Sequence, residues 1–106
     1  MNLVFLGTSK FAIAPLEALL KSKHKVLGII TQPDRPAGRG MQLTVTPIKE
    51  FSKNLKIPVL QPEKVNTDAV YAFLNQHKPD VLVVVAYGEF LGERLLKFCK
   101  TAPIRD

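Results

Sequence analysis

The sequence predicts an α/β fold, a doubly wound parallel sheet with helices on both faces. Two observations indicate it. Short apolar runs alternate with amphipathic segments along the whole chain, which is the pattern of consecutive βαβ units. One of these runs, residues 81–86, is continuously apolar, as in a central parallel strand that is buried on both faces. A length of 106 residues allows a single domain with a modest core.

The first βαβ unit occupies residues 2–31. Residues 2–7 form an apolar run that ends in glycine, which predicts a buried strand. Thr8 or Ser9 can cap the following helix, expected over residues 11–22, with Pro15 tolerated in its first turn. Residues 25–31 are the second strand, and its crossover from the first should be right-handed. The helix is expected to pack on the sheet through Phe11, Leu16, Leu19 and Leu20.

Residues 32–45 are expected to form a long basic loop. Two prolines and two glycines within residues 31–40 exclude a regular helix or strand, and the connection is longer than the usual link of about 2–6 residues. The loop carries Arg35 and Arg39 beside Gly38 and Gly40. Guanidinium groups and accessible backbone amides suit a polyanion. The alternative is a surface loop without a ligand.

The second half of the chain continues the alternation. Thr46 followed by Pro47 predicts a capped helix that ends near Leu55. A short edge strand is expected over residues 57–60, a helix from Asn66 or Thr67 through Leu74, the strand 81–86, and a last helix over residues 92–98. The expected strand order is about 3-2-1-4, a Rossmann-like arrangement. Ligands should then bind at the carboxyl ends of the strands, where residues 7–10, 32–45 and 86–89 meet.

Several classes of protein are disfavoured by the sequence. Residues 7–10 are neither a dinucleotide fingerprint nor a P-loop, so ordinary NAD or ATP binding is not expected. The single cysteine, Cys99, excludes an internal disulfide and fits a reducing compartment. No metal site is expected. Because the longest apolar run is too short to cross a membrane and no signal peptide is recognisable, we expect a cytoplasmic protein with no membrane partner.

The net charge of +6 is unevenly distributed along the chain. Residues 1–58 contain nine Lys or Arg and three acidic residues, whereas residues 59–106 contain six of each. The excess positive charge therefore lies in the half that contains the basic loop, which favours a polyanionic partner for one face. A solvated lysine-rich surface is the alternative.

Four segments carry a resemblance to a known family. They are Phe5-Leu6-Gly7-Thr8, the run from Thr31 to Gly40, Pro58-Val59-Leu60-Gln61-Pro62, and Val83-Val84-Val85-Ala86-Tyr87-Gly88. Their order and spacing resemble the amino-terminal part of the methionyl-tRNA formyltransferase family, from residue 1 to about Leu96. The family transfers a formyl group from 10-formyltetrahydrofolate to the amino group of methionine on initiator tRNA in translation initiation.

The resemblance implies two binding regions. The basic loop would contact initiator methionyl-tRNA through Arg35, Arg39, Gly38 and Gly40. The segment after residues 81–86 would border the folate, with Tyr87 and Gly88 at the start of the loop and Phe90 and Leu91 as apolar surface. Core packing is the alternative role for Phe90 and Leu91. The family usually has two lysines where this chain has Met41 and Gln42, so electrostatic contact with tRNA should be weaker.

No catalytic residue is expected within residues 1–106. The family's asparagine and histidine lie two apart on the strand after residues 81–86, and its aspartate lies on a later loop. Asn75-Gln76-His77 matches the text of that motif but sits at the end of a helix, where residues two apart point in different directions. We therefore expect a single incomplete, truncated amino-terminal formyltransferase domain that is inactive alone.

Two other functions and a tendency to self-associate are also expected from the sequence. The chain could belong to another folate-dependent formyltransferase, acting on an amino sugar or a glycinamide nucleotide, or it could be a non-catalytic tRNA-binding module. The long basic loop argues against the first alternative. The strand over residues 81–86 would be an exposed apolar sheet edge, so we also expect self-association.

Overall fold

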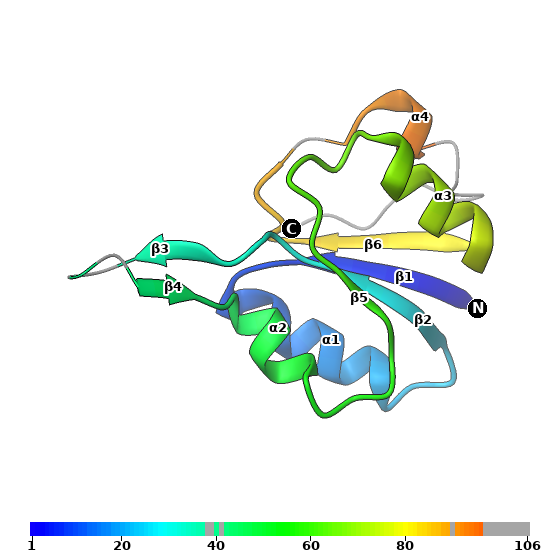
Figure 1. Ribbon diagram of the computed structural model, residues 1–106. Coiled ribbons are helices and arrows are strands. Elements are labelled where there is room, and N and C mark those ends of the chain that lie inside the picture. The colour runs from blue at the N-terminus through cyan, green and yellow to red at the C-terminus, as the bar shows by residue number, and fades with distance from the viewer. Residues whose placement is uncertain (38–39, 41, 90, 97–106) are drawn as a thin grey trace.

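The fold is a four-stranded parallel sheet between two layers of helices (Figure 1). A computed structural model describes residues 1–37, 40, 42–89 and 91–96. The strands of the sheet are β1 (Asn2–Gly7), β2 (Lys25–Ile30), β5 (Val59–Leu60) and β6 (Val81–Val85). Their spatial order is β5-β2-β1-β6, which confirms the predicted 3-2-1-4 order when these four strands are counted along the chain.

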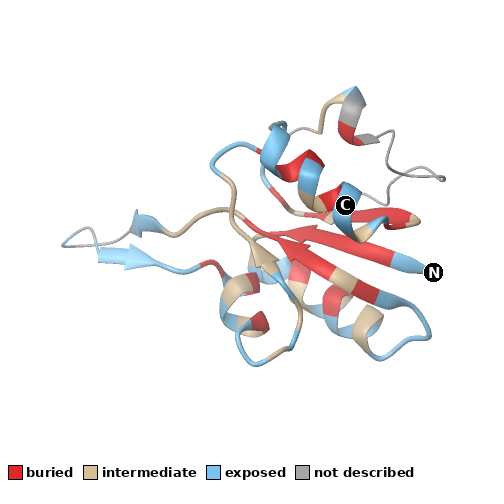
Figure 2. Cartoon of the chain, turned by 45° about the vertical axis from the view of Figure 1, so that its right-hand side comes forward, coloured by how far each residue is buried: buried red, intermediate tan, exposed pale blue. Residues whose placement is uncertain are grey.

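Strand β1 lies at the centre because it pairs with β2 on one side and with β6 on the other. Leu3 is aligned with Val26 of β2 and Val81 of β6. The side chains of β1 alternate between the two faces of the sheet: Leu3 and Phe5 join one apolar cluster, whereas Val4 and Leu6 join the other. Each face therefore has its own core, as a doubly wound sheet requires (Figure 2).

The first layer contains the turn η1 (Lys10–Ala12), α1 (Ile13–Leu20) and α2 (Pro47–Ser52). Leu16 of α1 and Ile48 of α2 are fully buried against the sheet. The prediction for Phe11 was wrong, because its side chain is 72% exposed. Residues 10–12 form a 3-10 turn capped by Ser9, and this tighter turn places Ala12, not Phe11, in the core.

The second layer contains α3 (Asp68–His77) and α4 (Glu93–Leu96). Val70, Tyr71 and Leu74 of α3 pack with Leu82 of β6. The Asn75–His77 segment occupies the last turn of α3, where the His77 ring packs on Phe73 with centroids 4.5 Å apart. This helical placement agrees with rejecting the segment as a catalytic strand motif.

Residues 32–45 are not the irregular loop that the prolines and glycines predicted. They contain β3 (Arg35–Ala37) and β4 (Gln42–Thr44), which pair antiparallel with Arg35 opposite Thr44. Figure 1 shows this β3-β4 hairpin projecting away from the sheet. The prediction failed because Pro36 is tolerated in a two-stranded ribbon, where every strand is an edge, and because residues 42–44 are exposed throughout.

Several element boundaries also differ from the expectation, and α1 covers only Ile13–Leu20 of the predicted residues 11–22. Helix α2 ends at Ser52, before the predicted Leu55, and β5 is limited to Val59–Leu60. Within the parts of the chain that the structure describes, no helix is long and apolar enough to span a membrane.

Candidate functional site at the carboxyl ends of the strands

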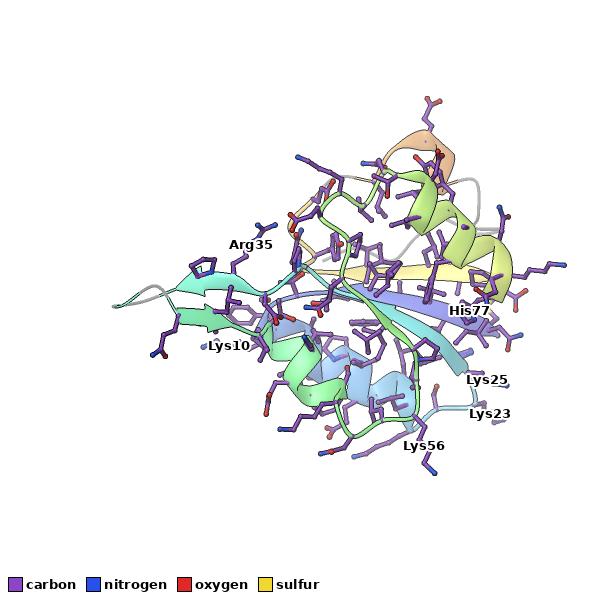
Figure 3. All side chains as sticks on the ribbon, in the orientation of Figure 1. Lys10, Lys23, Lys25, Arg35, Lys56 and His77 are labelled. Atoms are coloured by element: carbon purple, nitrogen blue, oxygen red, sulfur yellow. The ribbon has the colours of Figure 1, made fainter. Side chains whose placement is uncertain are left out.

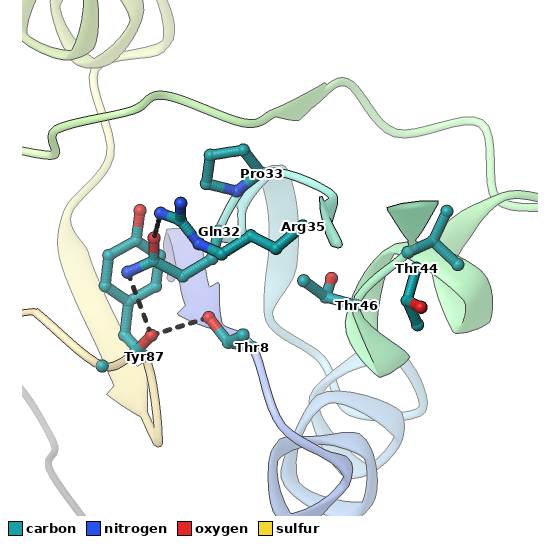
Figure 4. A pocket seen from close by; sticks show the side chains of 9 residues that line it. Thr8, Gln32, Pro33, Arg35, Thr44, Thr46 and Tyr87 are labelled. Atoms are coloured by element: carbon teal, nitrogen blue, oxygen red, sulfur yellow. Dashed lines mark hydrogen bonds between the residues drawn. The ribbon is translucent and has the colours of Figure 1, made fainter. Parts of the chain in front are cut away.

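An open pocket of about 460 Å³ lies where the carboxyl ends of β1, β2 and β6 meet the base of the hairpin (Figure 4). The parallel strands bring these ends to one edge of the sheet, the location that the sequence predicted. The pocket is lined by Thr8, Gln32, Pro33, Arg35, Thr44, Val45, Thr46, Tyr87 and Gly88.

The backbone carbonyl of Tyr87 connects the walls of this pocket. The Thr8 hydroxyl donates a hydrogen bond of 2.7 Å to this oxygen, and the Gln32 side-chain amide donates another of 3.4 Å. Two unusual backbone angles shape the turn that presents it, with φ of 48° at Ala86 and 99° at Gly88. The second value favours glycine, so Gly88 is suited to its position in the turn.

Gln32 also contacts the hairpin. The Arg35 guanidinium donates to the Gln32 side-chain oxygen at 3.3 Å. Figure 4 shows that this bond and the bond to Tyr87 are made by the two ends of the same Gln32 amide. Arg35 is itself exposed. Its remaining donors therefore face solvent at the mouth of the pocket, where they can bind an anion.

Asp34 fixes the base of the hairpin to the body of the domain. Its carboxylate accepts a hydrogen bond from the Gln61 amide at 2.9 Å and pairs with the Lys49 ammonium at 3.2 Å. Gln61 donates as well to the backbone carbonyl of Gln32 at 3.1 Å. The hydrogen bond from Gln61, followed by Lys49, holds the pKa of Asp34 below its ordinary value.

Thr46 closes the other end of the hairpin. Its hydroxyl accepts from the Lys49 amide at 3.1 Å and so caps α2, as the Thr-Pro pair predicted. The same oxygen lies 2.8 Å from the Thr31 hydroxyl, which follows β2. The two threonines join both ends of residues 32–45, so the hairpin projects from a fixed base.

The Tyr87 ring is buried in the second apolar cluster, while its backbone carbonyl accepts the hydrogen bonds from Thr8 and Gln32. The side chain is 2% exposed, and its hydroxyl has no hydrogen-bond partner among the described residues. Burial raises the pKa of Tyr87 far above its usual range, and the nearby Glu89 carboxylate adds to this effect. The phenol is therefore neutral at any physiological pH.

Glu89 connects this turn to the segment that precedes α3. Its carboxylate oxygens accept hydrogen bonds from the Val65 amide at 3.1 and 3.2 Å.

The predicted site residues lie in three settings. Arg35 and Gly40 belong to the hairpin, with Gly40 at φ 82°, while Tyr87 and Gly88 line the pocket beside it. Leu91 is half-buried and packs against the second apolar cluster. Gly38, Arg39 and Phe90 lie outside the described residues, and the binding roles of all these residues stay predictions.

Described basic residues lie at both ends of the sheet. Figure 3 shows Arg35 and Lys10 near the hairpin, but Lys23, Lys25 and Lys56 at the opposite end of the sheet. The separation arises because β2 runs from Lys25 towards the hairpin and six extended residues span about 20 Å. The excess positive charge of residues 1–58 therefore does not gather at the hairpin alone.

The residues that anchor the hairpin were not predicted from the sequence. They are Gln32, Asp34, Lys49 and Gln61. A usable signal was present, because a Gln-Pro pair follows the carboxyl end of β2 (Gln32-Pro33) and the same pair follows β5 (Gln61-Pro62). Among the described residues, no group of three or more His, Cys, Asp or Glu could hold a metal ion.

Comparisons with known proteins agree with the resemblance noted in the sequence. The chain is 48% identical over 96 residues to the methionyl-tRNA formyltransferase of Herpetosiphon aurantiacus and 43% identical over 96 residues to that of Thermotoga maritima, covering 91% of this chain and 31% of each relative. It is 45% identical over 101 residues to that of Sulfurihydrogenibium, covering 94% of this chain and 32% of the relative.

This chain therefore spans about a third of the length of the curated relatives that it matches. Residues 1–104 also match the profile of the formyl transferase family. The match covers almost the whole sequence, including every strand of the sheet and the hairpin. This chain belongs to the formyl transferase family.

Proposed function

We propose that this chain provides the tRNA-contacting and folate-bordering part of a methionyl-tRNA formyltransferase. The enzyme would transfer a formyl group from 10-formyltetrahydrofolate to the amino group of methionine on initiator tRNA, in the cytoplasm. One observation carries the proposal: an arginine-bearing hairpin projects from a fixed base directly beside the Tyr87–Gly88 turn. An RNA end held by the hairpin would reach the same edge of the sheet as the formyl donor.

The hairpin suits RNA because the Arg35 guanidinium is displayed, not neutralised. Arg35 keeps donors free after its bond to Gln32, and the nearby carboxylate of Asp34 is bonded to Gln61 and Lys49. The backbone at Gly40 has space around it, since a Cβ there would meet nothing within 4 Å. Arg39 and Gly38 would complete the phosphate contacts.

The Tyr87–Gly88 turn suits the edge of a flat heteroaromatic ring. Gly88 is exposed and has no Cβ, so a ring can approach its backbone closely. Pro33 and Val45 add apolar surface to the same pocket. Phe90 and Leu91 follow directly and would extend the apolar wall.

Formyl transfer to an amine passes through a tetrahedral intermediate, which needs a donor for the oxyanion and groups that move protons. We propose no catalytic residue within residues 1–106, so this chain alone would bind without turnover. Another formyl acceptor, such as an amino sugar or a glycinamide nucleotide, would be too small to need a projecting hairpin.

The test is filter binding of formylatable initiator tRNA against elongator tRNA at two salt concentrations. We expect the wild-type chain to prefer initiator tRNA, and Arg39→Ala to weaken that preference and lower the salt dependence by about one counterion. Lys25→Ala, at the far end of the sheet, is the matched control and should leave the preference unchanged. Equal binding of both tRNAs by the wild-type chain would contradict the proposal.

A further inference from the structure

The side chain of Gln32 is the one described group that hydrogen-bonds both to a hairpin cation and to the Tyr87–Gly88 turn. It follows β2 directly and is half-buried, so it lies at the junction between sheet, hairpin and pocket. Its backbone carbonyl is held by Gln61, which restricts where the side chain can reach. Gln32 is therefore an anchored link between two regions that the proposed function assigns to different ligands.

The chemistry of the two partners fixes the orientation of the amide. A guanidinium can only donate, and a backbone carbonyl can only accept. Only an amide with its oxygen towards Arg35 and its NH₂ group towards the Tyr87 carbonyl satisfies both, at 3.3 and 3.4 Å. A carboxylate could not donate to Tyr87, and an asparagine would be one methylene shorter.

The Tyr87 carbonyl accepts a second, shorter hydrogen bond beside the one from Gln32. Thr8 donates to the same carbonyl at 2.7 Å, whereas the bond from Gln32 is long. A change in the position or polarisation of the Gln32 amide would therefore alter this carbonyl without breaking its bond to Thr8. Gly88 comes next in the chain, and a Cβ on it would lie 3.7 Å from the Gln32 nitrogen, so the turn is in contact with this amide.

We propose that Gln32 is a positioning residue that transmits the binding of an anion at Arg35 to the position of the Tyr87–Gly88 turn. A phosphate that binds the remaining donors of Arg35 repositions the guanidinium and so changes its bond to the Gln32 oxygen, and the amide then changes its bond to the Tyr87 carbonyl. Occupation of the hairpin by RNA would thus change the turn that borders the formyl donor. The inference rests on the proposed function for the identity of the two ligands, but not for the link itself.

The experiment follows the backbone amides of the 106-residue chain by ¹⁵N NMR while an RNA minihelix with the acceptor stem of initiator tRNA is added. In the wild type we expect the amides of both Thr44 and Gly88 to shift. In Gln32→Met, which has nearly the same shape and cannot form either bond, Thr44 should still shift while Gly88 should not. Gln76→Met, the same change at an exposed position of α3 away from the hairpin, is the control and should behave as the wild type.

A second variant separates the link from simple packing. Gln32→Glu keeps an acceptor for Arg35 but loses the donor to Tyr87, so it should also abolish the response of Gly88. A response of Gly88 that persists in Gln32→Met or Gln32→Glu would overturn the inference. So would a wild-type chain in which Thr44 shifts and Gly88 does not.

An arm without RNA distinguishes failure of this inference from failure of the proposed function. Arg35→Met should shift the Gly88 amide when Gln32 is present and have no such effect in the Gln32→Met background. If the minihelix shifts neither Thr44 nor Gly88, the proposed function fails, and this double-mutant cycle decides the link on its own. Independent effects of the two substitutions in the cycle would overturn it.

Discussion

At the scale of single residues, the hairpin is held by side chains that each bond in two directions. Gln61 donates to Asp34 and to the backbone of Gln32, and Thr46 bonds both the Lys49 amide and the Thr31 hydroxyl. Groups shared between two partners fix angles as well as distances, because neither bond can shorten without bending the other. The base of the hairpin is therefore defined by only a few polar side chains.

Asp34 offers a direct test of this arrangement. Because the Gln61 amide and Lys49 lower its pKa from the ordinary 3.8, Asp34 stabilises the fold above that pH, and this contribution is lost as the pH falls through the lower folded value. A carboxyl ¹³C titration should give a midpoint below 3.8. Gln61→Ala should raise the midpoint most and Lys49→Met less.

Lys53→Met is the matched control for that titration. Lys53 lies one turn further along the same segment and pairs with Glu50, not with Asp34. It should leave the Asp34 midpoint where it is in the wild type. A wild-type midpoint at or above 3.8 would refute the hydrogen-bonded geometry of the carboxylate.

At the scale of elements, the start of α2 decides where the hairpin ends. Thr46→Ala removes the cap and leaves the buried Thr31 hydroxyl without this partner, so we expect a loss of about 1–2 kcal/mol in the free energy of unfolding, measured in urea. Thr46→Ser should retain most of the stability. Thr67→Ala is a suitable comparison, since the Thr67 hydroxyl caps no amide of α3 and donates only to the Lys64 carbonyl in an exposed setting, so a smaller loss is expected. An equal loss in both alanine variants would contradict a stabilising role for the cap.

The elements that the sequence predicted are those with a packing periodicity. The central strands and α3 have one face or both faces in the core, and the Thr-Pro start of α2 has its own local chemistry. The β3-β4 hairpin could not be predicted in this way. Residues 42–44 are all exposed, so their sequence shows no alternation of apolar and polar residues. Phe11 was misplaced because a helical period was extended over what is a 3-10 turn.

The candidate site was predictable in location but not in detail. Strand order placed Gly7–Lys10, the hairpin and Ala86–Glu89 at one edge, and the pocket lies there. The contacts among Gln32, Asp34 and Gln61 depend on the approach of β5 to β2, a pairing of only two residues on each strand. The repeated Gln-Pro pair marks Gln32 and Gln61, but no local pattern encodes which side chains they contact.

At the scale of the whole molecule, the sheet edge formed by β6 leads to a prediction about association. Within the described residues β6 pairs with β1 on one side only, and its sequence is entirely Val and Leu. An apolar edge of this kind favours pairing with another chain. Light scattering should therefore give a mass for this chain that increases with concentration. A monomer mass at every concentration would be the contrary result.

Among the described residues, basic side chains lie at both ends of the sheet. Arg35 and Lys10 lie near the hairpin, whereas Lys23, Lys25 and Lys56 lie at the far end (Figure 3). Both ends could attract RNA through charge alone. The proposed function requires that geometry, not charge, selects the hairpin.

This requirement can be tested by mapping the amide shifts that the initiator acceptor-stem minihelix causes. We expect the shifted amides to cluster at Arg35, Thr44 and Gly88, and those of Lys23, Lys25 and Lys56 to stay unchanged. Shifts concentrated at Lys23, Lys25 and Lys56, with the hairpin unaffected, would contradict it.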